Sequence, residues 1–161
     1  MKRIFFIVLI LAAAFSLNAY AALDTTSLLD LRNKIFEESQ AIKPLLTESG
    51  SKDIILLNSM CDVGIMTISQ LDAYFYMAGI FNAVKDSPGS ATAVDYLIKW
   101  LSEVKKGSDA NLKVLASITT PVEAGTTKHI QILSNYYTDL SKQLDVEINK
   151  VVLLKKALKQ Q

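Results

Sequence analysis

The C-terminal segment of the chain repeats its apolar residues at alternating steps of three and four, with one interruption at Glu147. This spacing averages about 3.5 residues and keeps an apolar stripe on one side of a helix over many turns. Pro121 suits the first turn of such a helix, and Lys155 and Lys156 suit its C-terminal end. We therefore predict one helix of roughly 40 residues. Its stripe consists of Ile130, Leu133, Tyr137, Leu140, Leu144, Val151, Leu154 and Leu158.

Three earlier segments show the same helical spacing. The first begins near residues 25–27 and is expected to end at Pro44 and Gly50, and the second covers about residues 51–85. The third begins within residues 87–90 and contains Gly107, which follows two lysines in a pattern typical of a helix end. We nevertheless favour one continuous, distorted third helix, because a break would leave a hole in the packing.

Short connections near residues 46–51, 86–90 and 119–121 make sequential helices antiparallel neighbours. The predicted fold is therefore all-α: an up-down-up-down antiparallel four-helix bundle with long helices. The short first helix is expected to leave part of the bundle thinly covered. The residues expected to form the core include Ile68, Leu71, Leu133, Leu140 and Leu144.

The N-terminus has the pattern of a secretory signal peptide. Two basic residues precede the apolar run Ile4 to Phe15, and Ala19-Tyr20-Ala21 has the small-x-small form of a cleavage site. The run is shorter than the roughly 20 residues of a bilayer-spanning helix, which disfavours an uncleaved anchor. We expect cleavage after Ala21, giving a signal peptide over residues 1–21 and a single helical-bundle domain over residues 22–161. The destination is the periplasm or the exterior, with a bacterial envelope favoured.

Charge and hydropathy argue against two classes of partner. Removal of Lys2 and Arg3 takes the net charge of the chain from +1 to −1, so no overall field attracts nucleic acid. The second segment is apolar enough to suggest a membrane span. Gln70 and Asp72 lie inside it, however, and a charge at mid-bilayer is unfavourable, so we expect a core helix and no stable span. The single cysteine, Cys61, is expected to be a buried free thiol.

The sequence contains no recognisable catalytic or cofactor motif. It has one histidine, His129, and lacks the Glu-x-x-His pairs of a di-iron bundle and the phosphate-binding glycine motifs. We therefore expect no enzyme activity, no cofactor and no metal site. A remote alternative is b-type haem held between Met60 and His129, which would share a level if their helices began at the same end.

Aromatic side chains gather late in the second segment and early in the third, which a short loop joins. We favour an aromatic core end, with the polar tips of tyrosine and tryptophan at the surface. The alternative is a contact surface, where an uncovered groove receives a partner helix, a peptide or a lipid-like ligand. The residues of this candidate surface are Tyr74, Tyr76, Tyr96 and Trp100, with Tyr136 in a second patch.

These observations favour an exported, non-enzymatic bundle that acts through protein–protein contacts. The roles that fit are an envelope accessory, a chaperone-like factor or a subunit of a surface assembly, with a partner of unknown identity. The alternative is a periplasmic carrier or sensor of a small or lipid-like ligand. Self-association into a homo-oligomer stays open.

Overall fold

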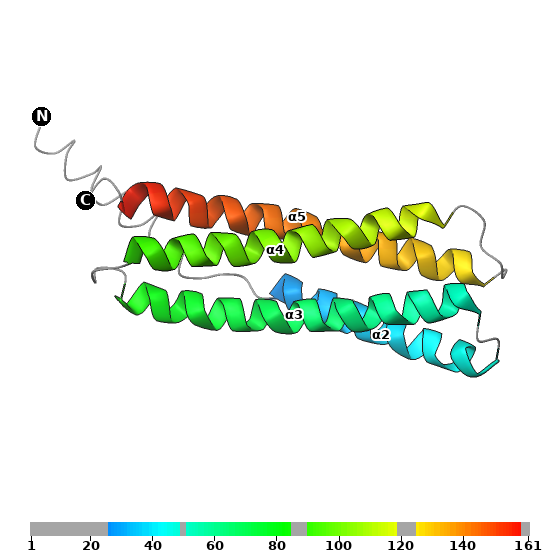
Figure 1. Cartoon of the computed structure of the whole chain (residues 1–161). Coiled ribbons are helices and arrows are strands. Elements are labelled where there is room, and N and C mark those ends of the chain that lie inside the picture. Colours follow the sequence, from blue (N-terminus) through cyan, green and yellow to red (C-terminus); the bar gives the residue numbers. More distant parts are fainter. Residues whose placement is uncertain (1–25, 49–50, 85–89, 119–124, 159–161) are drawn as a thin grey trace, which may run out of the picture.

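The computed structural model describes residues 26–48, 51–84, 90–118 and 125–158, nearly all of them helical. In chain order the helices are α2 (Thr26–Glu48), α3 (Lys52–Val84), α4 (Ser90–Ser117) and α5 (Thr126–Leu158). Figure 1 shows them lying lengthwise beside one another. The predicted all-α, four-helix architecture is confirmed for this part of the chain. The predicted signal peptide lies outside the described residues.

The apolar stripes read from the sequence face the interior. Cys61 is buried among them as a free thiol, as predicted. Burial withdraws the thiolate from water, which raises the pKa of this thiol to about 12. All five residues predicted for the core are buried: Ile68, Leu71, Leu133, Leu140 and Leu144.

Two helix boundaries differ from the prediction. α2 continues through Pro44 to Glu48, because Leu45 and Leu46 beyond the proline pack against the core. α5 is 33 residues long and begins at Thr126, directly after a turn at Gly125, so it is shorter than predicted.

Gly107 lies inside α4, which is continuous from Ser90 to Ser117 as predicted. The buried Ser108 donates a hydrogen bond from its hydroxyl to the carbonyl of Tyr137 at 3.2 Å. Lys105 and Asp109, one turn apart across the glycine, form an ion pair at 2.9 Å. These contacts hold the helix together at a residue with low helix propensity.

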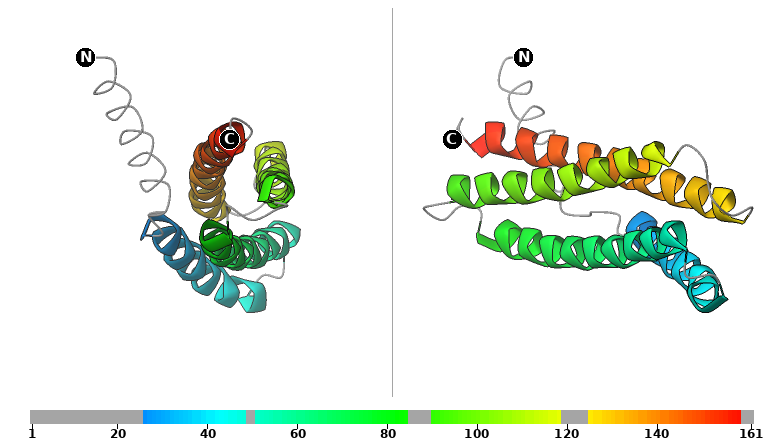
Figure 2. Two further views of the ribbon diagram at one scale, coloured as in Figure 1. Left: turned by 90° about the vertical axis from the view of Figure 1, so that its left-hand side faces the viewer. Right: turned by 45° about the vertical axis from the view of Figure 1, so that its right-hand side comes forward.

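The four helices do not pack on one another equally. The most extensive packing joins α4 to α5, followed by α2 to α3, whereas α3 and α4 share far less. Figure 2 shows this arrangement, with α4 beside α5 and α3 beside α2. The helices therefore pack most closely as two pairs, α2 with α3 and α4 with α5, and the packing between the two pairs is less extensive.

α3 contains a stretch, Lys52–Phe81, that is long and apolar enough to cross a membrane, with a mean hydropathy of 1.5. None of the other described helices is long and apolar enough to do so. The core helix of a soluble protein can have the same length and hydropathy. One side of α3 faces the bundle interior, where side chains such as those of Ile54 and Leu57 are buried. Val63 and Met66 remain exposed, so α3 carries apolar residues on an outer side as well.

Candidate functional site

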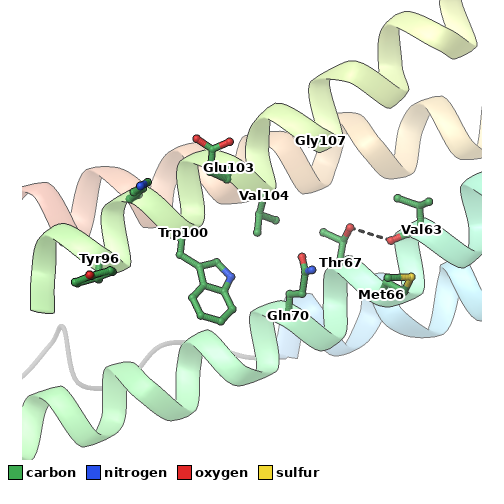
Figure 3. Close-up of a pocket in the computed structure, with 10 residues that line it drawn as sticks. Val63, Met66, Thr67, Gln70, Tyr96, Trp100, Glu103, Val104 and Gly107 are labelled. Carbon is green, nitrogen blue, oxygen red and sulfur yellow. Dashed lines mark hydrogen bonds between the residues drawn. The ribbon is translucent and has the colours of Figure 1, made fainter.

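A groove of about 580 Å³ lies between α3 and α4, one helix from each closely packed pair. Figure 3 shows the side chain of Trp100 directed from α4 toward α3, and that of Gln70 directed from α3 toward α4. Trp100 is 37% exposed and Met66 is 62% exposed, so the apolar walls are open to solvent. The lining residues are Val63, Met66, Thr67, Gln70, Tyr96, Lys99, Trp100, Glu103, Val104 and Gly107.

Helical periodicity explains why these residues share the groove. On α4, Tyr96, Trp100 and Val104 recur at steps of four, so they form one stripe. Gly107 continues the stripe, and nothing lies within 4 Å of the place where its Cβ would be, which leaves that end of the groove open. On α3, the hydroxyl of Thr67 donates to the carbonyl of Val63 at 2.9 Å and therefore requires no partner from a ligand.

Two charged side chains, Glu103 and Lys99, line the groove. Glu103 accepts a hydrogen bond from Lys106 at 2.7 Å, and this contact lowers the pKa of the Glu103 carboxyl. Lys99 is exposed and forms no ion pair within the described part of the chain. The groove therefore combines apolar walls with a carboxylate that is paired with Lys106 and a lysine, Lys99, that forms no ion pair among the described residues, which suits binding better than chemistry.

The structure does not bring all the residues of the candidate aromatic surface together. Tyr96 and Trp100 line the groove, and Tyr96 is 71% exposed. Tyr76 is 75% exposed but lies outside the groove. The predicted aromatic core end is therefore wrong for Tyr76 and Tyr96, although it holds for the buried Tyr74 and Phe81.

Tyr74 and Tyr136 do not belong to a contact surface, because both are buried. The hydroxyl of Tyr74 donates to Glu147 at 3.0 Å, and that of Tyr136 donates to the carbonyl of Gly64 at 3.1 Å. Their polar tips are thus satisfied inside the bundle and need no solvent. Burial raises the pKa of both phenols above the ordinary tyrosine value, and the neighbouring Glu147 adds to the effect at Tyr74.

The structure does not bring Met60 and His129 together. The carbonyl of Met60 accepts a hydrogen bond from the hydroxyl of Tyr137 at 2.6 Å. His129 precedes Tyr137 by eight residues, about 12 Å along α5 at 1.5 Å per residue. Its Nδ1 instead lies 2.6 Å from a carboxylate oxygen of Glu38. The engagement of His129 with Glu38 does not support the haem alternative.

The pair of Glu38 and His129 was missed by sequence reasoning. The side chains are 6% and 13% exposed, so His129 is not the surface residue that its place near the start of a helix indicates. Glu38 lies in the apolar stripe of α2, between Ile35 and Ile42. A carboxylate in a core position requires a partner. A glutamate in an apolar stripe and a single histidine in the chain were therefore the sequence features that could have predicted this pair.

A further polar cluster joins α4 to α5. The ammonium group of Lys105 donates to the hydroxyl of Ser141 at 2.9 Å, and this hydroxyl donates to Asp109 at 2.6 Å. The hydrogen bond to Asp109 raises the pKa of Lys105, so its amine stays protonated and is unable to accept the serine proton. The cluster therefore links two helices and does not resemble an activated nucleophile.

Within the described ranges, no three His, Cys, Asp or Glu side chains gather closely enough to hold a metal ion. The groove between α3 and α4 thus remains the strongest candidate for a functional site. The chain matches no protein-family model, no curated protein and no solved structure.

Proposed function

We propose that the chain is an exported, non-enzymatic protein that acts by contact with another protein, through the groove between α3 and α4. The roles that fit are an envelope accessory, a chaperone-like factor or a subunit of a surface assembly. The mature chain would begin at Ala22, without a stable membrane span and without nucleic acid as a partner. The observation that carries the proposal is the exposed apolar groove with Trp100 and Tyr96 in its wall.

The residue types in the groove favour a protein partner. Tryptophan and tyrosine are enriched among the residues that contribute most to protein–protein affinity. Exposed apolar surface of this kind is unfavourable in water unless something covers it for part of the time. Met66 adds a flexible apolar side chain, a type common at binding surfaces.

The antiparallel up-down-up-down topology belongs to the same proposal. Arg32 of α2 pairs with Asp72 of α3 at 3.4 Å, and Ile35 approaches Gly64. The residue numbers rise along α2 as they fall along α3, which supports antiparallel neighbours.

A second candidate function is a carrier or sensor of a small, lipid-like ligand. A volume of about 580 Å³ lies within the range of roughly 300–1,000 Å³ typical of ligand pockets. Lys99, at the rim and without an ion pair among the described residues, would suit the acidic head of such a molecule.

Site-specific photo-crosslinking tests the leading proposal. A photoreactive residue replaces Tyr96 at the groove or Lys142 on the exposed side of α5. The full chain is expressed in its own host. We expect one discrete crosslinked protein from position 96, identified by mass spectrometry, and none of it from position 142. The same protein recovered equally from both positions, or adducts with lipid alone, would refute a protein partner at the groove.

Two matched substitutions strengthen the test. Met66→Gln places a polar group in the groove, and Val146→Gln makes the same kind of change at an exposed valine of α5. The crosslink should weaken with Met66→Gln and persist with Val146→Gln. N-terminal sequencing of the exported protein tests the compartment, with Ala22 expected as the first residue.

A further inference from the structure

We infer that the partner segment received by the groove is a single amphipathic helix with an acidic edge, placed so that a carboxylate meets Lys99. This inference rests on the proposed function. It adds the shape and the charge of the binding segment, and it concerns the groove between α3 and α4 alone.

The length of the groove suits a short helix. Its wall on α4 extends from Tyr96 to Gly107, which corresponds to about 16 Å, or about three helical turns. A helix bound in a groove places its contacts at positions i, i+3, i+4 and i+7, over roughly 10 Å. The wall therefore accommodates the full set of contacts with a turn to spare.

The open side of the groove favours a helix over an acyl chain. Pockets for small ligands usually bury about 70–90% of the ligand surface. Met66 and Tyr96, on opposite walls, are both mostly exposed, so the walls do not close over an occupant. An amphipathic helix needs only its apolar stripe covered, and its polar side remains in water.

The charge of the occupant follows from the ion pairs along α4. Asp95 is paired with Lys155 of α5, and Glu103 is paired with Lys106. Both carboxylates near the groove on this helix are thus neutralised, and Lys99 between them has no ion pair among the described residues. A carboxylate on the edge of the incoming helix would give Lys99 an ion pair, whereas a basic edge would place a like charge beside it.

Intrinsic fluorescence reports directly on the groove, because Trp100 is the only tryptophan of the sequence. The probes are two synthetic helical peptides with identical leucine stripes, one with glutamate and one with lysine along the edge of the stripe. Each is titrated into the mature protein. We expect a blue shift of the Trp100 emission and tighter binding of the glutamate peptide, by about twofold to fivefold, as for an exposed ion pair.

Charge reversal supplies the decisive control. Lys99→Glu should reverse the order of the two peptides. Lys113→Glu makes the same change in net charge at an exposed lysine of α4 outside the groove and should leave the order intact. Circular dichroism verifies that both variants are folded.

Two results would overturn the inference. One is equal affinity for the two peptides, or an order that Lys99→Glu does not change. The other is a fluorescence response to palmitate or to anionic phospholipid vesicles without any response to either peptide. A protein crosslinked at position 96 would still support the proposed function in the first case, so the two failures are distinguishable.

Discussion

Replacing Gly64 with alanine should destabilise the protein, although the same change elsewhere in its helices should stabilise it. A Cβ on Gly64 would lie 2.8 Å from Cγ1 of Ile35 and 3.1 Å from Cε1 of Tyr136. Neither neighbour moves away easily. Ile35 is fully buried, and the hydroxyl of Tyr136 is hydrogen-bonded to the carbonyl of Gly64 itself.

The expected magnitude is a difference between two effects. Overpacking of a core by one methyl group typically costs about 1–3 kcal/mol. The higher helix propensity of alanine returns about 1 kcal/mol. Because both neighbours are constrained, we expect a net loss of about 1–2 kcal/mol in the free energy of unfolding. Gly79 and Gly107 have open space where a Cβ would lie, so alanine there should gain about 0.5–1 kcal/mol.

Thermal melts of the mature protein, followed by circular dichroism, measure all three variants. The midpoint should fall with Gly64→Ala and rise with Gly79→Ala and Gly107→Ala, by roughly 3–5 °C per kcal/mol in a chain of this size. Stabilisation of Gly64→Ala to the same extent as the other two would refute the close approach of α2 and α5 to α3 at this residue.

Three further outcomes follow from burial. Leu140→Ala should lower the free energy of unfolding by about 2–5 kcal/mol, whereas Lys142→Ala should change it by less than about 0.5 kcal/mol. Urea denaturation measures both variants, and equal shifts of the midpoint would contradict the core assignment. Cys61 should resist a thiol reagent in the folded protein and react quickly in urea, and rapid labelling without urea would show that it is accessible. Stability should fall as the pH rises above about 9, because the unfolded chain then releases protons that folded Cys61 and Tyr74, with their raised pKa values, retain. A urea midpoint unchanged between neutral pH and about pH 11 would contradict this.

Periodicity predicted the helices and the core because both depend on which side of a helix is apolar. Ile68, Leu140 and the continuous path through Gly107 all follow from that pattern. The N-terminal end of α5 was not predicted correctly. Pro121 is a good signal for a helix start, but the helix begins only after the turn at Gly125.

The candidate site was half predicted. Tyr96 and Trp100 belong to the contact surface that the sequence offers as the alternative to an aromatic core end, but Tyr74 is grouped with them there although it faces the core. Composition shows that aromatic residues are close in sequence, whereas the helix rotates by about 100° per residue and separates them. The groove itself depends on how α3 packs against α4, and Met66 becomes a lining residue only through that packing.

The tyrosine hydroxyls buried between α3 and α5 have a consequence for folding. The two closely packed pairs, α2 with α3 and α4 with α5, each join helices adjacent in sequence, so most close packing is local, which favours rapid formation of both pairs. Apolar stripes alone would permit several sliding positions when the two pairs then meet. Tyr136 and Tyr137 donate to the carbonyls of Gly64 and Met60, and a slip along the helix axis would leave these phenols buried without acceptors. We expect these two hydrogen bonds to select a single register from the alternatives that the apolar contacts tolerate.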